Sequence, residues 1–380
     1  MSCSLCRLPF TPGPISVDPH PPPPGILSEK LYNYFRWGVA MGSWVPGAVT
    51  NLEWLDNNSF GNMPSIPMVL NVQWESPGGT ILVCHTVCAT IVRATFDAQD
   101  DSLQAYTDLC QIEKVLGRPM MGAQGGRLSD VDYEGVGHKV DLRPFWALNN
   151  EERNIEFNWH GFMSNNLGWM LNRPDVFPRF RPTVAAERLN FGPSPIATSD
   201  ILTTQPVDIL HVLLSYLSDA SFVLLLSTCR LLRRHALTTL QPHARVRVLA
   251  LGWAVPLPHE YARAAELRAK NGQAPVPMAH AQESPYDGDW MLYLSHVHRS
   301  AGMRVRRHLW AIALELRRAY DEKLELSEYA DVQDENGKMV PSKARKELEK
   351  LVEPLFFIGQ IFRNKVPRSE MAKYMQNAPQ

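Results

Sequence analysis

Two short pairs of residues have the types and spacing of metal ligands. Cys3 and Cys6 are separated by two residues near the N-terminus, and His85 and Cys88 repeat this spacing later in the chain. Zinc takes four tetrahedral nitrogen or sulfur ligands, and two residues at this spacing can both bind from one turn of chain. The sequence therefore predicts a structural zinc site made by Cys3, Cys6, His85 and Cys88, with Cys84 as an alternative ligand.

Other interpretations of these cysteines stay open at this point. Free cysteines are often buried as small apolar residues, so Cys88 and Cys110 could simply belong to the core, behind a disordered N-terminal tip. A catalytic pair of Cys110 with His138 or His160 is a further alternative, because such partners meet only in the folded protein.

Signatures of other enzyme classes are missing from the sequence. It contains no Gly-x-Ser-x-Gly nucleophile turn and no His-Glu-x-x-His zinc motif. The glycine-rich stretch at 122–126 lacks the Lys-Ser/Thr that a phosphate-binding loop requires. We therefore expect a protein that is not an enzyme.

The composition indicates folded domains without a strong overall charge. The chain has 380 residues, enough for two or three domains, and 45% of them are hydrophobic. Its 38 Lys and Arg residues nearly balance 39 Asp and Glu residues, so no overall field favours nucleic acid or an anionic membrane. There are 30 prolines, more than the roughly 5% that is usual, which favours proline-rich segments between domains.

Neither a secretion signal nor a membrane helix is expected. Pro9, Pro12 and Pro14 come too early for a signal helix, and polar residues interrupt the longest apolar stretch, at 209–227. The prediction is a protein without membrane contact, located in the cytoplasm, the nucleus or both. The cysteines of such a protein are thiols or metal ligands more often than disulfides.

The N-terminal part, residues 1–172, is expected to mix helices and strands. Residues 68–74 have the pattern of a strand that ends in a turn at 76–79. A helical spacing follows, formed by Cys84, Cys88, Ile91, Val92 and Phe96. Residues 173–205 are rich in proline and are predicted to be a linker.

The C-terminal part, residues 246–380, is expected to be mostly helical. One apolar stripe at helical spacing consists of Leu309, Ile312, Ala313, Leu316 and Tyr320. A turn at 334–338 should precede a last helix that begins near Ser342.

The sequence pattern of residues 206–236 predicts three short helices. Pro206 and Asp208 suit a helix start, Ser218-Asp219 ends the first helix and caps the second, and a third follows Cys229. Together these helices carry more leucine than they can bury among themselves, which indicates a partner surface.

This segment resembles an F-box. The family pattern has a proline, an acidic residue two positions later, an aliphatic pair, Tyr-Leu, Asp, a leucine-rich second helix and Cys-Arg before an apolar residue. This sequence departs from the pattern at Gln205, where the family usually has leucine. Leu202 could substitute for that leucine if the preceding turn folds back. The matching residues are Pro206, Asp208, Ile209-Leu210, Tyr216-Leu217, Asp219, Leu225, Cys229-Arg230 and Leu232.

Further segments are similar to a group of fungal F-box proteins. That group pairs an N-terminal Cys-x-x-Cys with a His-x-x-Cys that opens a helix, and it carries an Asp-Tyr-Gly motif. Here the last motif reads Asp132-Tyr133-Glu134-Gly135, with Glu134 where glycine would follow tyrosine.

The resemblance implies a substrate receptor that docks on the Skp adaptor of a cullin-RING ubiquitin ligase and presents a protein substrate. The expected fold class is α+β, with a zinc-stapled mixed N-terminal domain, a three-helix F-box at 206–245 and a mostly α-helical C-terminal region. The predicted adaptor-binding residues are Pro206, Ile209, Leu210, Leu213, Leu217 and Leu225.

The alternative is a non-catalytic binding protein whose leucine-rich helices are core. Residues 220–259 contain five arginines in a stretch without acidic residues until Glu260, which could form a basic surface for nucleic acid or protein. Nucleic acid is the less favoured partner, since no aromatic stacking platform accompanies them. We expect these arginines to be solvated or paired with Asp321, Glu322, Glu325 and Glu328.

Overall fold

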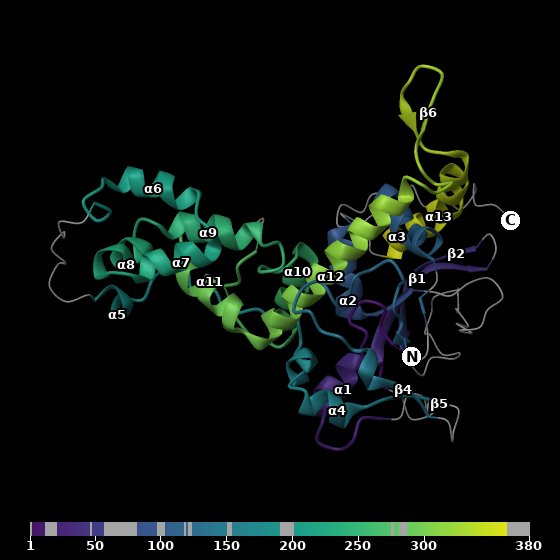
Figure 1. Ribbon diagram of the computed structural model, residues 1–380, viewed down its shortest axis with the longest axis horizontal. Helices are drawn as coiled ribbons and strands as arrows, with labels where there is room; N and C mark the ends of the chain where they lie inside the picture. The colour runs from purple at the N-terminus through teal and green to yellow at the C-terminus, as the bar shows by residue number, and fades with distance from the viewer. Residues whose placement is uncertain are drawn as a thin grey trace. The chain divides into compact units, whose positions relative to one another are not determined.

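The computed structural model describes residues 2–11, 21–45, 48–56, 82–96, 103–117, 119–120, 124–149, 154–190, 201–274, 277–280 and 287–362. These residues are mostly helical with few short strands, which is compatible with the α+β class (Figure 1). The strand predicted at 68–74 and its turn lie outside the described residues. The chain divides into two compact units, Met1–Leu171 with His308–Gln380 (unit 1) and Asn172–Arg307 (unit 2).

This division differs from the predicted domains in two respects. The region 246–380 is split inside helix α12 (Ala301–Leu324), because helix α13 (Lys343–Phe362) packs on α3 (Leu103–Leu116) of unit 1. Leu348 and Val352 of α13 are buried there against Cys110. The predicted linker contains α5 (Ala186–Leu189), which contacts a helix of unit 2.

A three-stranded antiparallel sheet lies in unit 1. Its central strand β1 (Trp37–Val45) directly follows α1 (Glu29–Arg36) and pairs with β2 (Ala48–Asp56) and β3 (Leu82–His85). Gly38 lies opposite His85, and a Cβ at Gly38 would come within 2.5 Å of the Phe10 ring. A glycine is therefore required where the N-terminal segment crosses this strand.

Helices α2 (Thr86–Thr95), α3 and α12 build the core around this sheet. Helix α2 follows β3 without a loop and has His85 as its N-cap residue, so Cys84 belongs to the strand and the predicted helix begins later. The predicted α12 stripe is confirmed: Leu309, Ile312, Ala313, Leu316 and Tyr320 are all buried.

Two hairpins complete unit 1. Strands β4 (Trp146–Asn149) and β5 (Asn154–Phe157) follow the short helix η3 (Arg143–Phe145) and precede α4 (Trp159–Ser164) and η4 (Gly168–Leu171). The β6 (Val332–Gln333) and β7 (Met339–Val340) hairpin contains the predicted turn, closed by the Asp334 amide donating to the Lys338 carbonyl oxygen at 2.9 Å. Helix α13 begins one residue after Ser342, as predicted.

Unit 2 consists of short helices. The three predicted helices are present as α6 (Val207–Ser215), α7 (Asp219–Ser227) and α8 (Arg230–Leu237). They are followed by α9 (Gln241–Ala250), α10 (Pro258–Lys270) and α11 (Trp290–Arg299), with α9 between α6 and α11 (Figure 1). None of the helices in the described part of the chain is long and apolar enough to cross a membrane.

Candidate functional site

The four predicted metal ligands come together in unit 1. The ligand atoms of Cys3, Cys6, His85 and Cys88 all lie within 4.8 Å of one another, and all four residues are buried. The N-terminal tip is therefore part of the core, and the alternative of a disordered tip is wrong. Two sulfur-bearing turns far apart in sequence form one donor set that could hold a metal ion.

Backbone geometry at the first pair suits anionic sulfur. Arg7 has a φ of 60°, and this turn lets its amide donate to the Cys3 carbonyl oxygen at 2.8 Å. The amides of Cys6 and His85 point at the Cys3 Sγ, at 3.5 and 3.4 Å, and the amide of Leu8 points at the Cys6 Sγ at 3.5 Å. Such N–H groups stabilise the thiolate form that binds a metal.

His85 is positioned by packing. Its Nδ1 lies 3.2 Å from the Cys6 Sγ, so this nitrogen faces the donor set. Its Nε2 is buried and has no hydrogen-bond partner among the described residues. The ring is held instead by Phe10 and Phe35, whose ring centroids lie 4.2 and 5.2 Å from its own.

The protonation of the cluster also fits a cation. Burial opposes ionisation of Cys3, but hydrogen bonds from the neighbouring thiols outweigh it and the pKa of Cys3 is lowered. Burial raises the pKa of Cys6, and hydrogen bonding to Cys3 raises those of Cys84 and Cys88. The four sulfurs therefore differ in how readily they ionise, and a bound divalent cation would favour the thiolate form of the cysteines that hold it.

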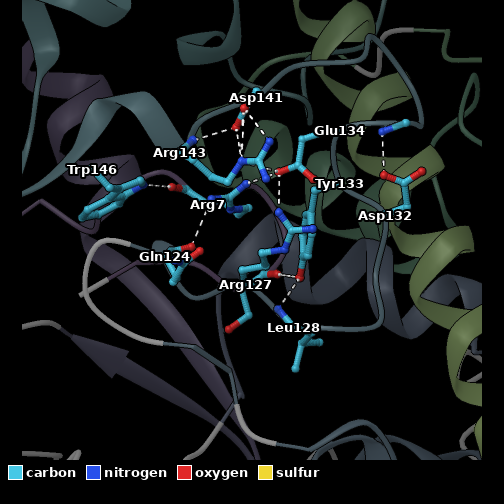
Figure 2. A network of polar contacts seen from close by, with 12 residues as sticks. Arg7, Gln124, Arg127, Leu128, Asp132, Tyr133, Glu134, Asp141, Arg143 and Trp146 are labelled. Atoms are coloured by element: carbon cyan, nitrogen blue, oxygen red, sulfur yellow. Dashed lines mark hydrogen bonds and ion pairs between the residues drawn. The ribbon is translucent and has the colours of Figure 1, made fainter.

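Arg7 anchors the first cysteine turn to the rest of unit 1 (Figure 2). Its side chain is buried, donates to the Gln124 carbonyl oxygen at 3.0 Å and lies over the Tyr133 ring. Its carbonyl oxygen accepts a hydrogen bond from Trp146 Nε1 at 3.0 Å. The Tyr133 hydroxyl donates to the Ser4 carbonyl oxygen at 2.7 Å, inside the Cys3–Cys6 turn.

Glu134 supplies the charge that Arg7 needs. Its Oε1 accepts from Nη1 of both Arg7 and Arg127 at 2.9 Å, and Arg143 Nε lies 3.7 Å away. The residue that departs from the Asp-Tyr-Gly pattern is thus the ion-pair partner of the arginine beside Cys6. Sequence reasoning missed Arg7, although an arginine directly after a ligand cysteine was a usable signal.

The remaining N-terminal cysteines have other surroundings. Cys84, on strand β3, lies beside Cys3 but is not one of the four clustered ligand residues. Cys110 is buried in the core, where burial raises its pKa to about 12. His138 packs instead on Trp169 and His308, and His160 is exposed. The structure does not bring Cys110 together with either histidine of the catalytic alternative.

A second feature is an uncovered apolar face on helix α6. Ile209, Val212, Leu213 and Tyr216 follow the i, i+3, i+4, i+7 spacing of one helix face, and their exposed fractions are 49, 59, 37 and 84%. The other side of the same helix, with Leu210 and Leu214, is buried in unit 2. We call the four exposed residues the α6 stripe.

The predicted adaptor residues are divided between these two sides. Leu210 is only 3% exposed, because the face on which it lies packs into the core of unit 2, so it does not belong to the exposed face. Pro206, Ile209 and Leu213 are exposed, and Leu217 and Leu225 are half-buried. The predicted adaptor set left out Val212, and it left out Tyr216 although this residue matches the family pattern; a split of the wide apolar face into two stripes would have identified both.

The residues before α6 form a turn, which is the condition under which Leu202 could substitute for the leucine of the family pattern. The Gln205 amide donates to the Leu202 carbonyl oxygen at 3.3 Å, and its side chain donates to the Ile201 carbonyl oxygen at 2.8 Å. Leu202 is half-buried beside this turn.

Arg247 of α9 fixes the corner between α6 and α7. It donates to the Leu214 and Leu217 carbonyl oxygens at 2.8 and 2.7 Å, pairs with Asp219 and lies over the Phe222 ring. The arginines of this stretch were expected to be solvated or paired with Asp321, Glu322, Glu325 and Glu328, and for Asp321 and Glu322 the structure shows other partners. These two acids pair within α12, with Arg317 and Arg318.

Comparison of the chain with protein-family models, curated proteins and solved structures finds no match.

We expect Glu134→Gln to lower the free energy of unfolding by about 1.5–3 kcal/mol, because the buried Arg7 loses its charged partner. The matched control is Asp141→Asn, which weakens the exposed Asp141–Arg143 pair and should cost less than about 1 kcal/mol. Urea denaturation of the full chain measures both. Equal losses in the two variants would contradict the anchoring role of Glu134.

A pH dependence is expected from the contact between α6 and α9. His211 Nδ1 lies 2.7 Å from His243 Nε2, and burial, His211 and Arg247 together lower the pKa of His243. The folded state therefore favours neutral His243, so this stability is complete above the ordinary histidine pKa of about 6.5 and is lost as pH falls below it.

Scanning calorimetry of the full chain between pH 7.5 and 5.5 checks this expectation. The fall in melting temperature should be about 1–2 °C larger for the wild type than for His243→Asn, a small difference because solvent screens the partly exposed pair. Parallel pH curves for the two proteins would show that His243 does not titrate as described.

Proposed function

We propose that the protein is an F-box substrate receptor that docks on the Skp adaptor of a cullin-RING ubiquitin ligase. The observation that carries the proposal is the α6 stripe. Four apolar residues at one-face spacing stay exposed on a helix whose opposite face is buried, which is the arrangement of a helix that binds a hydrophobic partner surface.

The neighbouring helix extends the apolar surface of the proposed docking site. Leu224 of α7 is 69% exposed, and Leu225 beside it is half-buried. Arg247 holds the α6–α7 corner through two carbonyl oxygens and Asp219, so the two helices are presented in a fixed relation before any partner arrives. Preorganisation of this kind lowers the entropic cost of binding.

The proposed mechanism is positional. A receptor of this kind holds a substrate protein close to a charged ubiquitin-conjugating enzyme and so raises the effective concentration of a substrate lysine. Ubiquitin transfer itself would be done by partner proteins. The chain contributes the adaptor face in unit 2 and a surface that selects the substrate.

We further propose that the metal ion is zinc. Three sulfurs and one imidazole nitrogen are the donor set that structural zinc prefers, and complete burial of the ligands is typical of closed structural sites. Cys3, Cys6, Cys88 and His85 Nδ1 would hold the ion. Its contribution would be to join the N-terminal turn to the start of α2.

The docking proposal predicts that the intact chain co-purifies with the Skp adaptor and that Leu213→Arg weakens this binding by about 30-fold or more, since a charge would be buried at the centre of the contact. Leu267→Arg is the matched control, because Leu267 is also an exposed leucine of unit 2, on α10. Isothermal titration calorimetry measures both affinities.

Circular dichroism must show that both variants keep their helices. Equal losses at Leu213 and Leu267, or a wild-type chain that does not bind at tens of micromolar adaptor, would contradict the proposal.

The zinc proposal predicts about one equivalent of zinc in the purified full chain. The full chain is needed because α12 and α13 complete unit 1. Cys88→Ser should lose the metal, whereas Cys110→Ser, which changes a buried cysteine of the core, should keep it. Elemental analysis with thermal melting in chelator gives the result, and less than about a tenth of an equivalent with unchanged melting would rule zinc out.

A further inference from the structure

A cleft of about 650 Å³ lies within unit 2, between α7, α8 and α11. Apolar side chains form much of its lining, including Leu226, Leu237 and Leu294, which are themselves buried. Val223 of α7 also lines the cleft and is 42% exposed, so an apolar contact surface remains available there. The α6 stripe does not line this cleft.

Positive charge gathers around this apolar lining. Arg188, Arg233 and Arg299 come from α5, α8 and α11, and all three line the cleft. Asp219 is the acidic residue of the lining, and it is paired with Arg247. In the part of the chain that the structure describes, no ion-pair partner is assigned to Arg233 or Arg299.

The local carboxylate that does bind a cleft arginine is Asp289. It forms an ion pair with Arg188, while its other oxygen accepts from the Leu292 amide at 3.1 Å as the N-cap of α11. Asp289 is buried, and each of its two carboxylate oxygens makes one of these contacts. It therefore neutralises one arginine and leaves Arg233 and Arg299 as excess positive charge.

The positively charged side chains around the cleft lie close enough to influence one another. Besides burial, the charges of Arg233 and Arg181 lower the pKa of Arg188. Burial and the charges of Arg181, Arg299 and Arg188 lower the pKa of His296 on α11. Arg188 thus lies close to Arg233, and His296 lies close to both Arg188 and Arg299, so the cleft presents several positive charges beside its apolar lining.

We propose that this cleft binds an acidic peptide segment of a partner protein, with an apolar side chain on the lining of α7, α8 and α11 and carboxylates on Arg233 and Arg299. Charge complementarity argues for this occupant, since an apolar peptide would leave two guanidinium groups without counter-charges. The site is separate from the α6 stripe and does not depend on adaptor docking.

The test uses the full chain without adaptor and fluorescein-labelled peptide pools in which a fixed leucine is flanked on both sides by glutamates, glutamines or phosphoserines. Fluorescence polarisation at low salt should give at least about tenfold tighter binding for the glutamate pool than for the glutamine pool. Added salt should reduce this preference, because exposed charges are screened.

The double variant Arg233→Glu with Arg299→Glu should remove the preference. Its matched control is Arg263→Glu with Lys270→Glu, an equal charge change at exposed positions of α10 outside the cleft. Circular dichroism checks that both variants fold.

Four outcomes would overturn the proposal: no binding of the glutamate pool, equal binding of the glutamate and glutamine pools, an equal loss in the control variant, or binding confined to the phosphoserine pool. The last would identify a phosphate site instead. Since no adaptor is present, failure here is distinct from failure of the docking proposal.

Discussion

Helix α6 is apolar on two sides, and its own unit covers only one of them. Leu210 and Leu214 are buried against neighbouring helices, while the α6 stripe remains in water. Leaving such a face exposed is unfavourable in proportion to its apolar area, and a helix with this pattern gains stability when a partner covers it. The exposed side is therefore the place where we propose a partner contact.

In unit 1, the group of Cys3, Cys6, His85 and Cys88 links distant parts of the chain. It joins the N-terminal turn to the junction of β3 and α2, and the packing of Phe10 on His85 requires the glycine at position 38. Arg7 extends this link to Glu134, Tyr133 and Trp146, so the residues next to the ligands are held by charge and hydrogen bonds (Figure 2). Outer contacts of this kind orient metal ligands in proteins.

Local signals in the sequence were sufficient for the four clustered residues and for the starts of α6, α7, α8 and α13. The Cys-x-x-Cys and His-x-x-Cys spacings predicted the four clustered residues, and Ser218 and Cys229 cap α7 and α8 through their side chains. The α12 stripe was predictable because helical periodicity and burial agree along its length.

Long-range packing accounts for what sequence reasoning missed. Nothing in the local pattern of α13 indicates that Leu348 and Val352 pack on α3, so the C-terminal region was assigned as a region of its own. Leu210 was placed on the adaptor face because periodicity alone does not tell which of two apolar stripes faces the core. The pairing of Arg7 with Glu134 depends on the tertiary fold for the same reason.

Hydrogen–deuterium exchange of the intact chain, with and without saturating Skp adaptor, is the sharpest test of the proposal that the adaptor docks on the α6 stripe. Docking at the α6 stripe should slow amide exchange in α6 and α7, at residues 207–227, and leave α2 and α3 of unit 1 unchanged. Protection in unit 1 alone, or unchanged exchange throughout α6 and α7, would contradict the claim.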